Sequence, residues 1–456
     1  MRLLPLTLVL IPCFLPWPAF ADAWEDLVES WWTPVLVDAD QEIALRNAVA
    51  EAVRLQPSLR REQARREELG EGVREVRAEW LPRIHVGLEQ RSSLSHTERR
   101  AFDSGSRVGA VAGVSQRLYD FGASSGRLQA ARGRLMAQEW HTRAMTEQFV
   151  LDALGAHYDL ARHQAHQTLA DINLARHEAI EARVLERVAG GAGSRADQLR
   201  AQSRVADARA RQVAVSGRRQ QAAAIYEAWF FSRPGPLPRP QFEFSPWLMA
   251  DLTTAQATAD NPVLHEALAR IEAGRGERRA AAGERWPQLR LDLQGRRFDV
   301  DRSDQGDTDL ALLVTVDYAL YNGGAAGARL AQARERERQA HWERQALERE
   351  LMHQWHGAEA EVRALGSELA AQYQAFQADQ AAVLAYEAQF SIGRRSLNDL
   401  LDAQRDLFQT SLRLVDLRVA LDLARFRQLA VAGALLDALQ IDAVTPSQSM
   451  GAGMDE

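Results

Sequence analysis

The amino-acid sequence predicts a mainly α-helical protein with a small β part, in which very long helices and four strands are arranged in two repeated halves. Two long spans, residues 123–190 and 325–391, contain no proline and few glycines. Four short segments alternate apolar and polar residues, which is the period of a β-strand. The order of these elements occurs twice, with a displacement of 202 to 205 residues. These observations together predict the fold class.

Composition excludes several classes of function. The chain has 456 residues, of which 26% are charged and 46% hydrophobic, so it is not a wholly disordered chain. The net charge of −7 does not provide the excess of basic residues that is typical of proteins that bind nucleic acid. The sequence shows no serine-histidine-acid arrangement, phosphate loop or dinucleotide fingerprint, so we expect neither an enzyme nor a bound cofactor. His163 and His166 have no cysteine or acid pair nearby, so no metal site is predicted.

The N-terminus resembles a secretory signal over residues 1–21, with Arg2, an apolar stretch and Ala19-Phe20-Ala21 as cleavage site. The alternative is a buried N-terminal helix, and four prolines in this segment argue against it. The single cysteine, Cys13, follows a proline, which fits a lipoprotein signal poorly. Residues 22–40 are expected to form an irregular lead-in. No later run of 18 apolar residues occurs, so no membrane-spanning helix is predicted.

The first structural repeat is expected over residues 41–232. A helix runs to residue 79, is broken at Gln56-Pro57, and ends before Pro82. Strands are predicted at about 83–94 and 107–119, with an exposed polar loop at 95–106. Tyr119 and Gly122 mark the turn into the long helix 123–190, which would extend for roughly 100 Å. A second helix is expected from Ser194 to about residue 231.

The second repeat is expected over residues 259–437, after a proline-rich inter-repeat linker at 233–258. Pro287 corresponds to Pro82 and precedes strands at about 288–298 and 309–320. Tyr321 and Gly324 correspond to the earlier turn into a long helix. That helix covers 325–391, and a last helix follows from Ser396 to about residue 436. Residues 438–456 are expected to be a flexible C-terminal tail.

Each repeat joins its last two helices by the same short frame, Gly-x-x-Ser-x-x-Asp-x-Leu-x-Ala-Gln. Glycine tolerates the left-handed C-terminal cap of the first helix, and serine caps the start of the second. The aspartate then lies in the first turn, where the helix dipole favours a carboxylate. The frame comprises Gly191, Ser194 and Asp197 in the first repeat, and Gly393, Ser396 and Asp399 in the second.

Four strands per chain are too few to close a barrel, because about eight is the smallest number that fills well. Alternation of apolar and polar residues is typical of a wall between lipid and water. An open four-stranded sheet in lipid would leave unpaired edges. Two interpretations therefore remain open: several chains share one barrel, or a soluble sheet caps a coiled-coil domain.

Several matched motifs resemble the TolC family of outer membrane factors. They are the paired Asn/Gln-Pro-x-Leu starts, the Tyr-Asp-Phe-Gly and Tyr-Asn-Gly-Gly strand ends, and the two hairpin frames, spread over residues 41–437. The resemblance implies a homotrimer in the outer membrane of a Gram-negative cell. Its twelve strands form one β-barrel in outer membrane lipid, and twelve helices form a periplasmic α-helical barrel. It also implies passive conduction, driven by an inner-membrane pump through a periplasmic adaptor (membrane fusion) protein.

Within the family, residues 193–197 and 393–404 are similar to the channels of type I secretion. That branch exports RTX-type toxins, proteases or adhesins with an inner-membrane ABC transporter. Because the signal segment fits a lipoprotein signal poorly, a lipidated cysteine is not expected, and this argues against many of the multidrug-efflux members of the family. One alternative is the outer membrane component of a multidrug or metal efflux pump, with a proton-driven pump. An alternative of another class is a structural periplasmic coiled-coil protein without a pore.

The resemblance also assigns roles at the hairpins. Asp399 and Asp402 lie on one helix face and match carboxylates that line the periplasmic aperture. Three copies of each would favour cations, and mutual repulsion is expected to raise a carboxyl pKa. Arg395 matches an arginine that ties this hairpin to its neighbour, with Asp197 as the acceptor. The alternative from the residues alone is that both aspartates simply stabilise the helix start.

Overall fold

The computed structural model describes residue 27 and residues 39–97, 100–237, 242, 244, 258–298 and 308–441. The predicted signal segment, and most of the lead-in, the inter-repeat linker and the C-terminal tail, lie outside these residues. The chain divides into two compact units. Unit 1 comprises Met1–Ala52, Phe149–Ala250 and His356–Leu429, and unit 2 comprises Val53–Gln148, Asp251–Trp355 and Ala430–Glu456.

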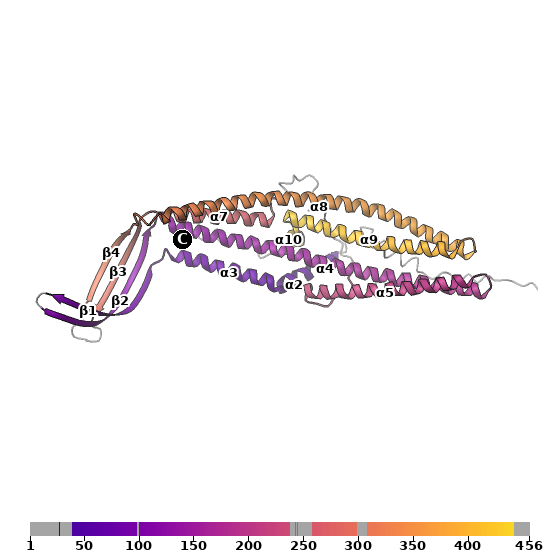
Figure 1. The fold of residues 1–456 in the computed structure, drawn as a ribbon, viewed down its shortest axis with the longest axis horizontal. Coiled ribbons are helices and arrows are strands. Elements are labelled where there is room, and N and C mark those ends of the chain that lie inside the picture. Colours follow the sequence, from indigo (N-terminus) through magenta and orange to yellow (C-terminus); the bar gives the residue numbers. More distant parts are fainter. Residues whose placement is uncertain are drawn as a thin grey trace, which may run out of the picture. The chain divides into compact units, whose positions relative to one another are not determined.

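Unit 2 contains a four-stranded antiparallel sheet, which confirms the four strands predicted from the sequence. The strands are β1 (Arg83–Thr97), β2 (Arg100–Tyr119), β3 (Gln288–Phe298) and β4 (Thr308–Asp317). They lie side by side in the order β1-β2-β3-β4, and the pairing of β2 with β3 joins the two sequence repeats (Figure 1).

The prediction of a polar loop over residues 95–106 was wrong. β1 continues to Thr97 and β2 begins at Arg100, and Ser95 pairs with Asp103 across the two strands. Ladder hydrogen bonds are made by the backbone, so a polar stretch can extend a hairpin that apolar alternation does not reveal. In the second hairpin β4 ends at Asp317, before the predicted end at residue 320. The loop 299–307 lies outside the described residues.

Four helical segments and one short helix complete unit 2. They are α3 (Pro57–Ala78), α7 (Pro262–Gly283), the N-terminal parts of α4 (Ala123–Ala189) and α8 (Ala325–Ser391), and α10 (Leu435–Ala438). α3 and α7 both begin with proline, whose missing N–H costs nothing in the first turn. α4 and α7 approach closely through small residues, and a Cβ atom at Gly133 would lie 2.6 Å from the backbone N of Ala273.

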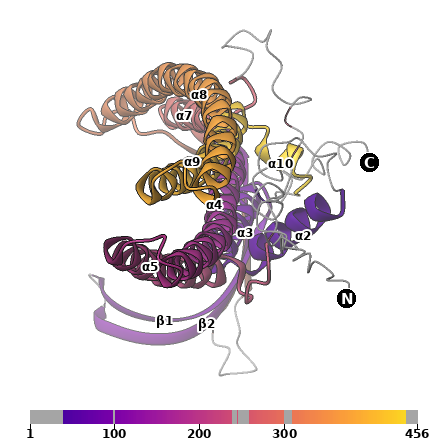
Figure 2. The ribbon, with the colours of Figure 1, turned by 90° about the vertical axis from the view of Figure 1, so that its right-hand side faces the viewer.

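Unit 1 is built from helices of both repeats. It contains most of α2 (Ala39–Leu55), the C-terminal parts of α4 and α8, and α5 (Arg195–Phe230) and α9 (Leu397–Ala432). α5 lies beside α4, and α9 lies beside both α4 and α8 (Figure 2). α9 ends earlier than predicted, because Gly433 leaves the helix with φ of 72°. Among the described residues, no helix has both the length and the apolar character needed to cross a membrane.

Candidate functional site

The sheet of unit 2 has one aliphatic face. The strand register places residues of β1 to β4 in cross-strand rows, and paired residues share a face. Two neighbouring rows contain only aliphatic residues and one glycine. These rows are Ile84, Val114, Leu293 and Leu312, and Val86, Ala112, Gly295 and Leu310.

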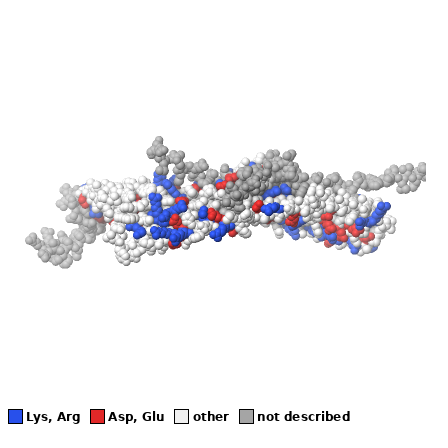
Figure 3. Space-filling view, turned by 90° about the horizontal axis from the view of Figure 1, so that it is seen from above, with Lys and Arg blue, Asp and Glu red and all other residues white. Residues whose placement is uncertain are grey.

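This aliphatic face is open to the surroundings of the chain. Val86 is 83% exposed, Leu312 is 66% exposed and Val314 is 63% exposed. A broad apolar surface of this kind marks an interaction site or a membrane contact, because water-facing surfaces rarely carry it. Figure 3 shows a face of the molecule on which charged side chains gather over the helices and are sparse over the strands.

The opposite face of the sheet is polar. Arg83 pairs with Ser115, Ser115 pairs with Asp292, and Arg290 pairs with Thr315. Gly113 leaves room on this face for the ring of His85, whose Nε2 would lie 2.7 Å from a Cβ atom at position 113. The sheet thus separates an apolar side from a polar side, as strands between lipid and an aqueous lumen do.

Exposed aromatic residues gather where the strands meet the helices. Tyr119 ends β2, and its ring centroid lies 4.8 Å from that of Phe121, which stacks at 5.6 Å on Trp286. Trp80 is also exposed in the turn before β1. Aromatic side chains of this kind form girdles at membrane–water interfaces, because their rings are amphipathic.

The predicted turn residues lie at these junctions. Gly122 and Gly324 have φ of 89° and 83°, a left-handed backbone that glycine adopts without strain. The other predicted turn residues lie at strand and helix ends. Pro82 precedes β1, Tyr119 is the last residue of β2, Pro287 precedes β3, and Tyr321 lies shortly before α8.

A charged cluster supports the first junction. Arg117 Nη1 donates to Glu79 Oε2 at 2.9 Å, and Arg127 Nη2 donates to the same oxygen at 2.8 Å. Burial alone would raise the pKa of Glu79, but the hydrogen bonds from Arg127 and Arg117 outweigh it and lower the pKa. Asp120 accepts a hydrogen bond at 2.8 Å from the backbone N of Ser124, which fixes the start of α4.

The hairpin ends of unit 1 have the same geometry in both repeats. Gly191 and Gly393 have φ of 75° and 76°. Ser194 forms a capping box with Asp197, whose backbone N donates to the serine Oγ at 3.1 Å. In the second hairpin, the backbone N of Asp399 donates to Ser396 Oγ at 3.3 Å. Each serine thus satisfies a free amide of the following helix.

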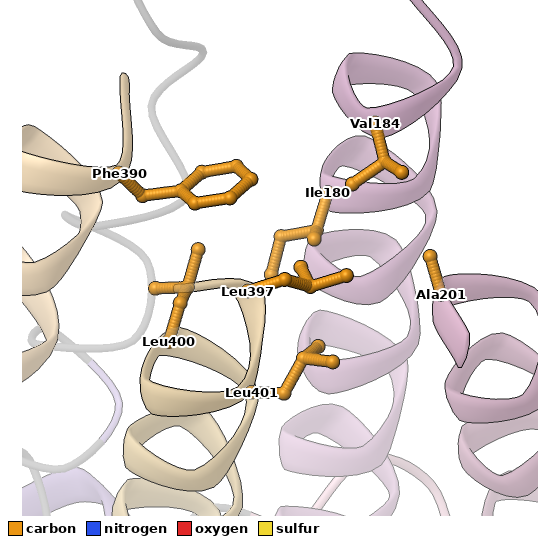
Figure 4. Close-up of a cluster of buried hydrophobic side chains, with 7 residues drawn as sticks. All are labelled: Ile180, Val184, Ala201, Phe390, Leu397, Leu400 and Leu401. Atoms are coloured by element: carbon orange, nitrogen blue, oxygen red, sulfur yellow. The ribbon is translucent and has the colours of Figure 1, made fainter. Parts of the chain in front are cut away.

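An apolar cluster packs the two hairpins together (Figure 4). Its members come from all four helices and are all buried: Ile180, Val184, Ala201, Phe390, Leu397, Leu400 and Leu401. Arg187 adds a polar contact, because its Nη1 donates to the carbonyl O of Phe390 at 2.9 Å and its guanidinium lies 4.8 Å from the Phe390 ring centroid. Arg200 Nη1 donates to Asn398 Oδ1 at 2.5 Å.

The sequence did not single out Arg187 or Arg200 as contacts between the hairpins. Arginine is abundant along these helices, so no local pattern distinguishes the two that reach across.

Asp399 and Asp402 lie on the exposed side of α9 near its start. Asp399 Oδ2 is 3.5 Å from Arg395 Nη1, and Asp402 Oδ1 is 3.2 Å from Arg405 Nη1. Within one chain the hydroxyl of Ser396, together with Arg395, lowers the pKa of Asp399. The sequence predicted a raised carboxyl pKa for three copies of these aspartates around one opening. Within a single chain the effect is the opposite, and the pKa of Asp399 is lowered.

Arg395 and Asp197 are not brought together within one chain. Arg395 lies 4.5 Å from the ring centroid of Tyr386, and its Nε donates to Gln389 Oε1 at 3.1 Å. Asp197 accepts its hydrogen bonds from Ser194. In the described chain, therefore, no ion pair joins Arg395 to Asp197.

His163 and His166 lie in contact on α4, with ring centroids 5.8 Å apart. His166 Nε2 is 3.2 Å from Asp416 Oδ1 of α9. Across the described ranges, no group of three or more histidine, cysteine or acidic side chains is placed to hold a metal ion.

The sequence matches the family described as outer membrane efflux protein over residues 48–229 and 254–434. The chain belongs to this family. The two matched segments correspond to the two repeats, and the family assigns the protein to the outer membrane.

Among individual relatives of this outer membrane efflux protein, Protein CyaE of Bordetella pertussis is 27% identical over 249 residues, which are 54% of this chain and 52% of CyaE. Outer membrane efflux protein BepC of Brucella suis is 24% identical over 305 residues, 66% of this chain and 67% of BepC. The matched region thus spans about half of CyaE and two thirds of BepC.

The fold has solved counterparts. A crystal structure of CusC that concerns conformational changes accompanying folding and transmembrane channel formation matches with a TM-score of 0.76 and 20% identity. The match covers 87% of this chain and 93% of CusC. At this identity the likeness concerns the fold, and it agrees with the long helices and four strands described above.

Proposed function

We propose that this outer membrane efflux protein is the channel-tunnel of a type I secretion system. Three copies share one barrel of twelve strands, which continues into a periplasmic barrel of helices. The conduit passively exports a protein, of the RTX-type toxin, protease or adhesin class. Its partners are a periplasmic adaptor protein and an inner-membrane ABC transporter.

The two-faced sheet supports the channel. β1 and β4 are its edges, and each is paired on one side only within the described chain. Lipid offers no water to satisfy the free N–H and C=O groups of such edges. Joining β1 of one copy to β4 of the next satisfies both edges, and about eight strands is the practical minimum for a barrel. Three copies give twelve strands, with the aliphatic rows toward lipid and the polar rows toward the lumen.

The hairpin sequences support the secretion branch, because Gly193–Asp197 and Gly393–Gln404 are similar to type I secretion channels. The second candidate is the outer membrane component of a multidrug or metal efflux pump, and the name of BepC favours it. The third interpretation of the sequence, a structural periplasmic coiled-coil protein without a pore, disagrees with the match to the outer membrane efflux protein family. Such a protein would be extracted without detergent, whereas a barrel in lipid requires detergent and runs as a compact trimer.

Deletion of the gene separates the secretion and efflux candidates. The proposal predicts that one or a few large proteins disappear from the culture medium and accumulate in the cell. Susceptibility to a panel of drugs and metals should stay within twofold of the parent. Proteomics of the medium and inhibitory concentrations measure the two outcomes. An unchanged set of secreted proteins with strong sensitisation to drugs or metals would favour efflux.

We infer that the start of α9 lines the periplasmic aperture. Asp399 and Asp402 are both solvent-exposed in the single chain, with side chains 41% and 50% accessible. Three copies would place six carboxylates around one opening, where they prefer cations over anions. Arg395 and Arg405 lie beside these carboxylates and set how much of their charge is neutralised.

A lock between Arg395 and Asp197 is proposed to run between neighbouring copies, since the two residues do not meet within one chain. The double variant Arg395→Cys, Asp197→Cys should then form covalent dimers and trimers under oxidising conditions. Arg395→Cys with Gln198→Cys, one residue away on α5, is the matched control. Non-reducing gel electrophoresis of outer membranes measures the products. Equal crosslinking in both pairs, or none in either, would contradict the lock.

A further inference from the structure

The aliphatic face of the sheet is bordered by aromatic side chains where the strands meet the helices. Its row nearest the helices contains Tyr119, Leu289 and Val316, which pair across β2, β3 and β4. The ring of Tyr119 contacts Phe121, and Phe121 stacks on Trp286. These three rings are between 45% and 57% exposed. Because this row continues the aliphatic face, the aromatic group lies on the side of the sheet that is expected to contact lipid.

Two exposed arginines, Arg279 and Arg285, lie beside this aromatic group and are called the junction arginines. Arg279 Nε is 3.6 Å from the position of a Cβ atom at Gly122, in the turn between β2 and α4. Arg285 directly precedes Trp286. Arg279 lies in the last turns of α7, roughly 6 Å along the axis from the end of the helix at about 1.5 Å per residue.

The carboxylates around this junction pair with other arginines or lie on the other face of the sheet. Glu284 Oε1 is 3.4 Å from Arg127 Nη1, and Glu284 Oε2 is 3.5 Å from Arg329 Nη1. Glu79 accepts its hydrogen bonds from arginines of β2 and α4. Asp317, the last residue of β4, lies on the polar face. In the described part of the chain the junction arginines form no ion pair, so their charge is available to an anionic partner.

We propose that the junction arginines and the aromatic group bind the headgroup of an anionic phospholipid in the periplasmic leaflet of the outer membrane. Guanidinium groups bind phosphate oxygens through charge-assisted hydrogen bonds. The headgroup layer is about 5–8 Å thick on each side of the hydrocarbon core, and Arg279 lies within that depth. A zwitterionic headgroup carries its own ammonium, which partly neutralises the phosphate. Two unpaired arginines therefore favour a lipid with a net negative charge.

This proposal rests on the lipid contact of the sheet that the proposed channel requires, and it adds the class of lipid bound at the junction. Aromatic rings alone would anchor the protein in any bilayer, because they are amphipathic. The junction arginines add the selectivity for charge. Acyl chains hold a lipid phosphate at the depth of these arginines, whereas free phosphate has no such anchor and should bind far more weakly.

Native mass spectrometry of the detergent-purified protein tests this selectivity. The protein is mixed with equal amounts of phosphatidylglycerol and phosphatidylethanolamine that have the same acyl chains. The parent should retain roughly fivefold more phosphatidylglycerol, because each basic residue near the membrane surface attracts anionic lipid. The double variant Arg279→Gln, Arg285→Gln should retain the two lipids about equally. Arg279→Lys with Arg285→Lys keeps both charges and should keep most of the preference.

The matched control is Arg132→Gln with Arg334→Gln. It removes two exposed arginines about 14 Å from the starts of α4 and α8, beyond the headgroup layer, and should bind lipid as the parent does. Equal retention of the two lipids by the parent would overturn the proposal, and so would a preference that survives in the glutamine double variant or is lost equally in the control. Retention of neither lipid would instead contradict the lipid contact of the sheet, and with it the proposed channel.

Discussion

At the scale of single residues, several charged groups occupy environments that a sequence does not reveal. Glu147 of α4 is 4% exposed, and its Oε1 has no hydrogen-bond partner. Burial raises its pKa to about 8, and Arg143 offsets only part of this effect. The residue is therefore mostly protonated at neutral pH.

We expect Glu147→Gln to stabilise the protein at alkaline pH. The folded pKa lies above the ordinary value of 4.5, so folded protein binds the proton more tightly and stability falls as pH rises from 4.5 to 8. Each unit of pKa shift corresponds to roughly 1.4 kcal/mol. The variant should melt several degrees above the parent at pH 9 and close to it at pH 5.

Thermal unfolding monitored by circular dichroism measures both conditions for Glu147→Gln. Glu335→Gln, an exposed substitution in α8, serves as the control and should change little at either pH. If Glu147→Gln melted at the same temperature as the parent at pH 9, ionisation of the Glu147 carboxyl would not destabilise the folded protein. The assignment of a raised pKa to Glu147 would then be wrong.

At the scale of elements, close packing of α4 against α7 depends on small residues. A Cβ atom at Gly276 would clash with the backbone of Ala130, and one at Gly283 would lie 2.5 Å from the backbone N of Ala123. Both helices would have to separate to admit a methyl group at these positions. The contact therefore fixes the spacing of α4, which follows β2, and α7, which leads into β3.

Gly276→Ala should destabilise the protein by about 1–3 kcal/mol, the usual cost of overpacking. Gly357→Ala in α8 is the matched control, because nothing lies within 4 Å of its Cβ position. That change should be neutral or stabilising by about 0.5–1 kcal/mol, since alanine favours a helix over glycine. Denaturant unfolding compares the two variants, and equal effects would show that α4 and α7 are not in contact as described.

At the scale of the whole molecule, the two sequence repeats do not coincide with the two compact units. α4 and α8 each extend over 67 residues and contribute to both units, so each repeat supplies parts of unit 1 and unit 2. Long proline-free spans and strand alternation were sufficient to predict the helices and four strands. The extension of β1 and β2, in which Ser95 pairs with Asp103, was not predictable, because ladder hydrogen bonds are made by the backbone and do not require apolar alternation.

The candidate site was predictable only in part. The repeated frame located Ser194 and Ser396 because capping is a local interaction. The contacts of Arg187 with Phe390 depend on helices brought together from distant parts of the sequence. No local pattern encodes such contacts. Arg395 illustrates the same limit, since its contacts within the chain are with Asp399 of α9 and with Gln389 and Tyr386 of α8.

Single-channel recording of the purified protein in planar lipid bilayers tests the central claim most directly. We predict discrete conductance steps that trivalent cobalt hexammine blocks from the periplasmic side, as expected if Asp399 and Asp402 ring the aperture as we propose. Asp399→Ala with Asp402→Ala should still conduct and should lose the block, whereas Asp406→Ala on the same helix should keep it. Inserted protein that gives no conductance steps would contradict the channel, and a double variant blocked as readily as the parent would contradict the aperture.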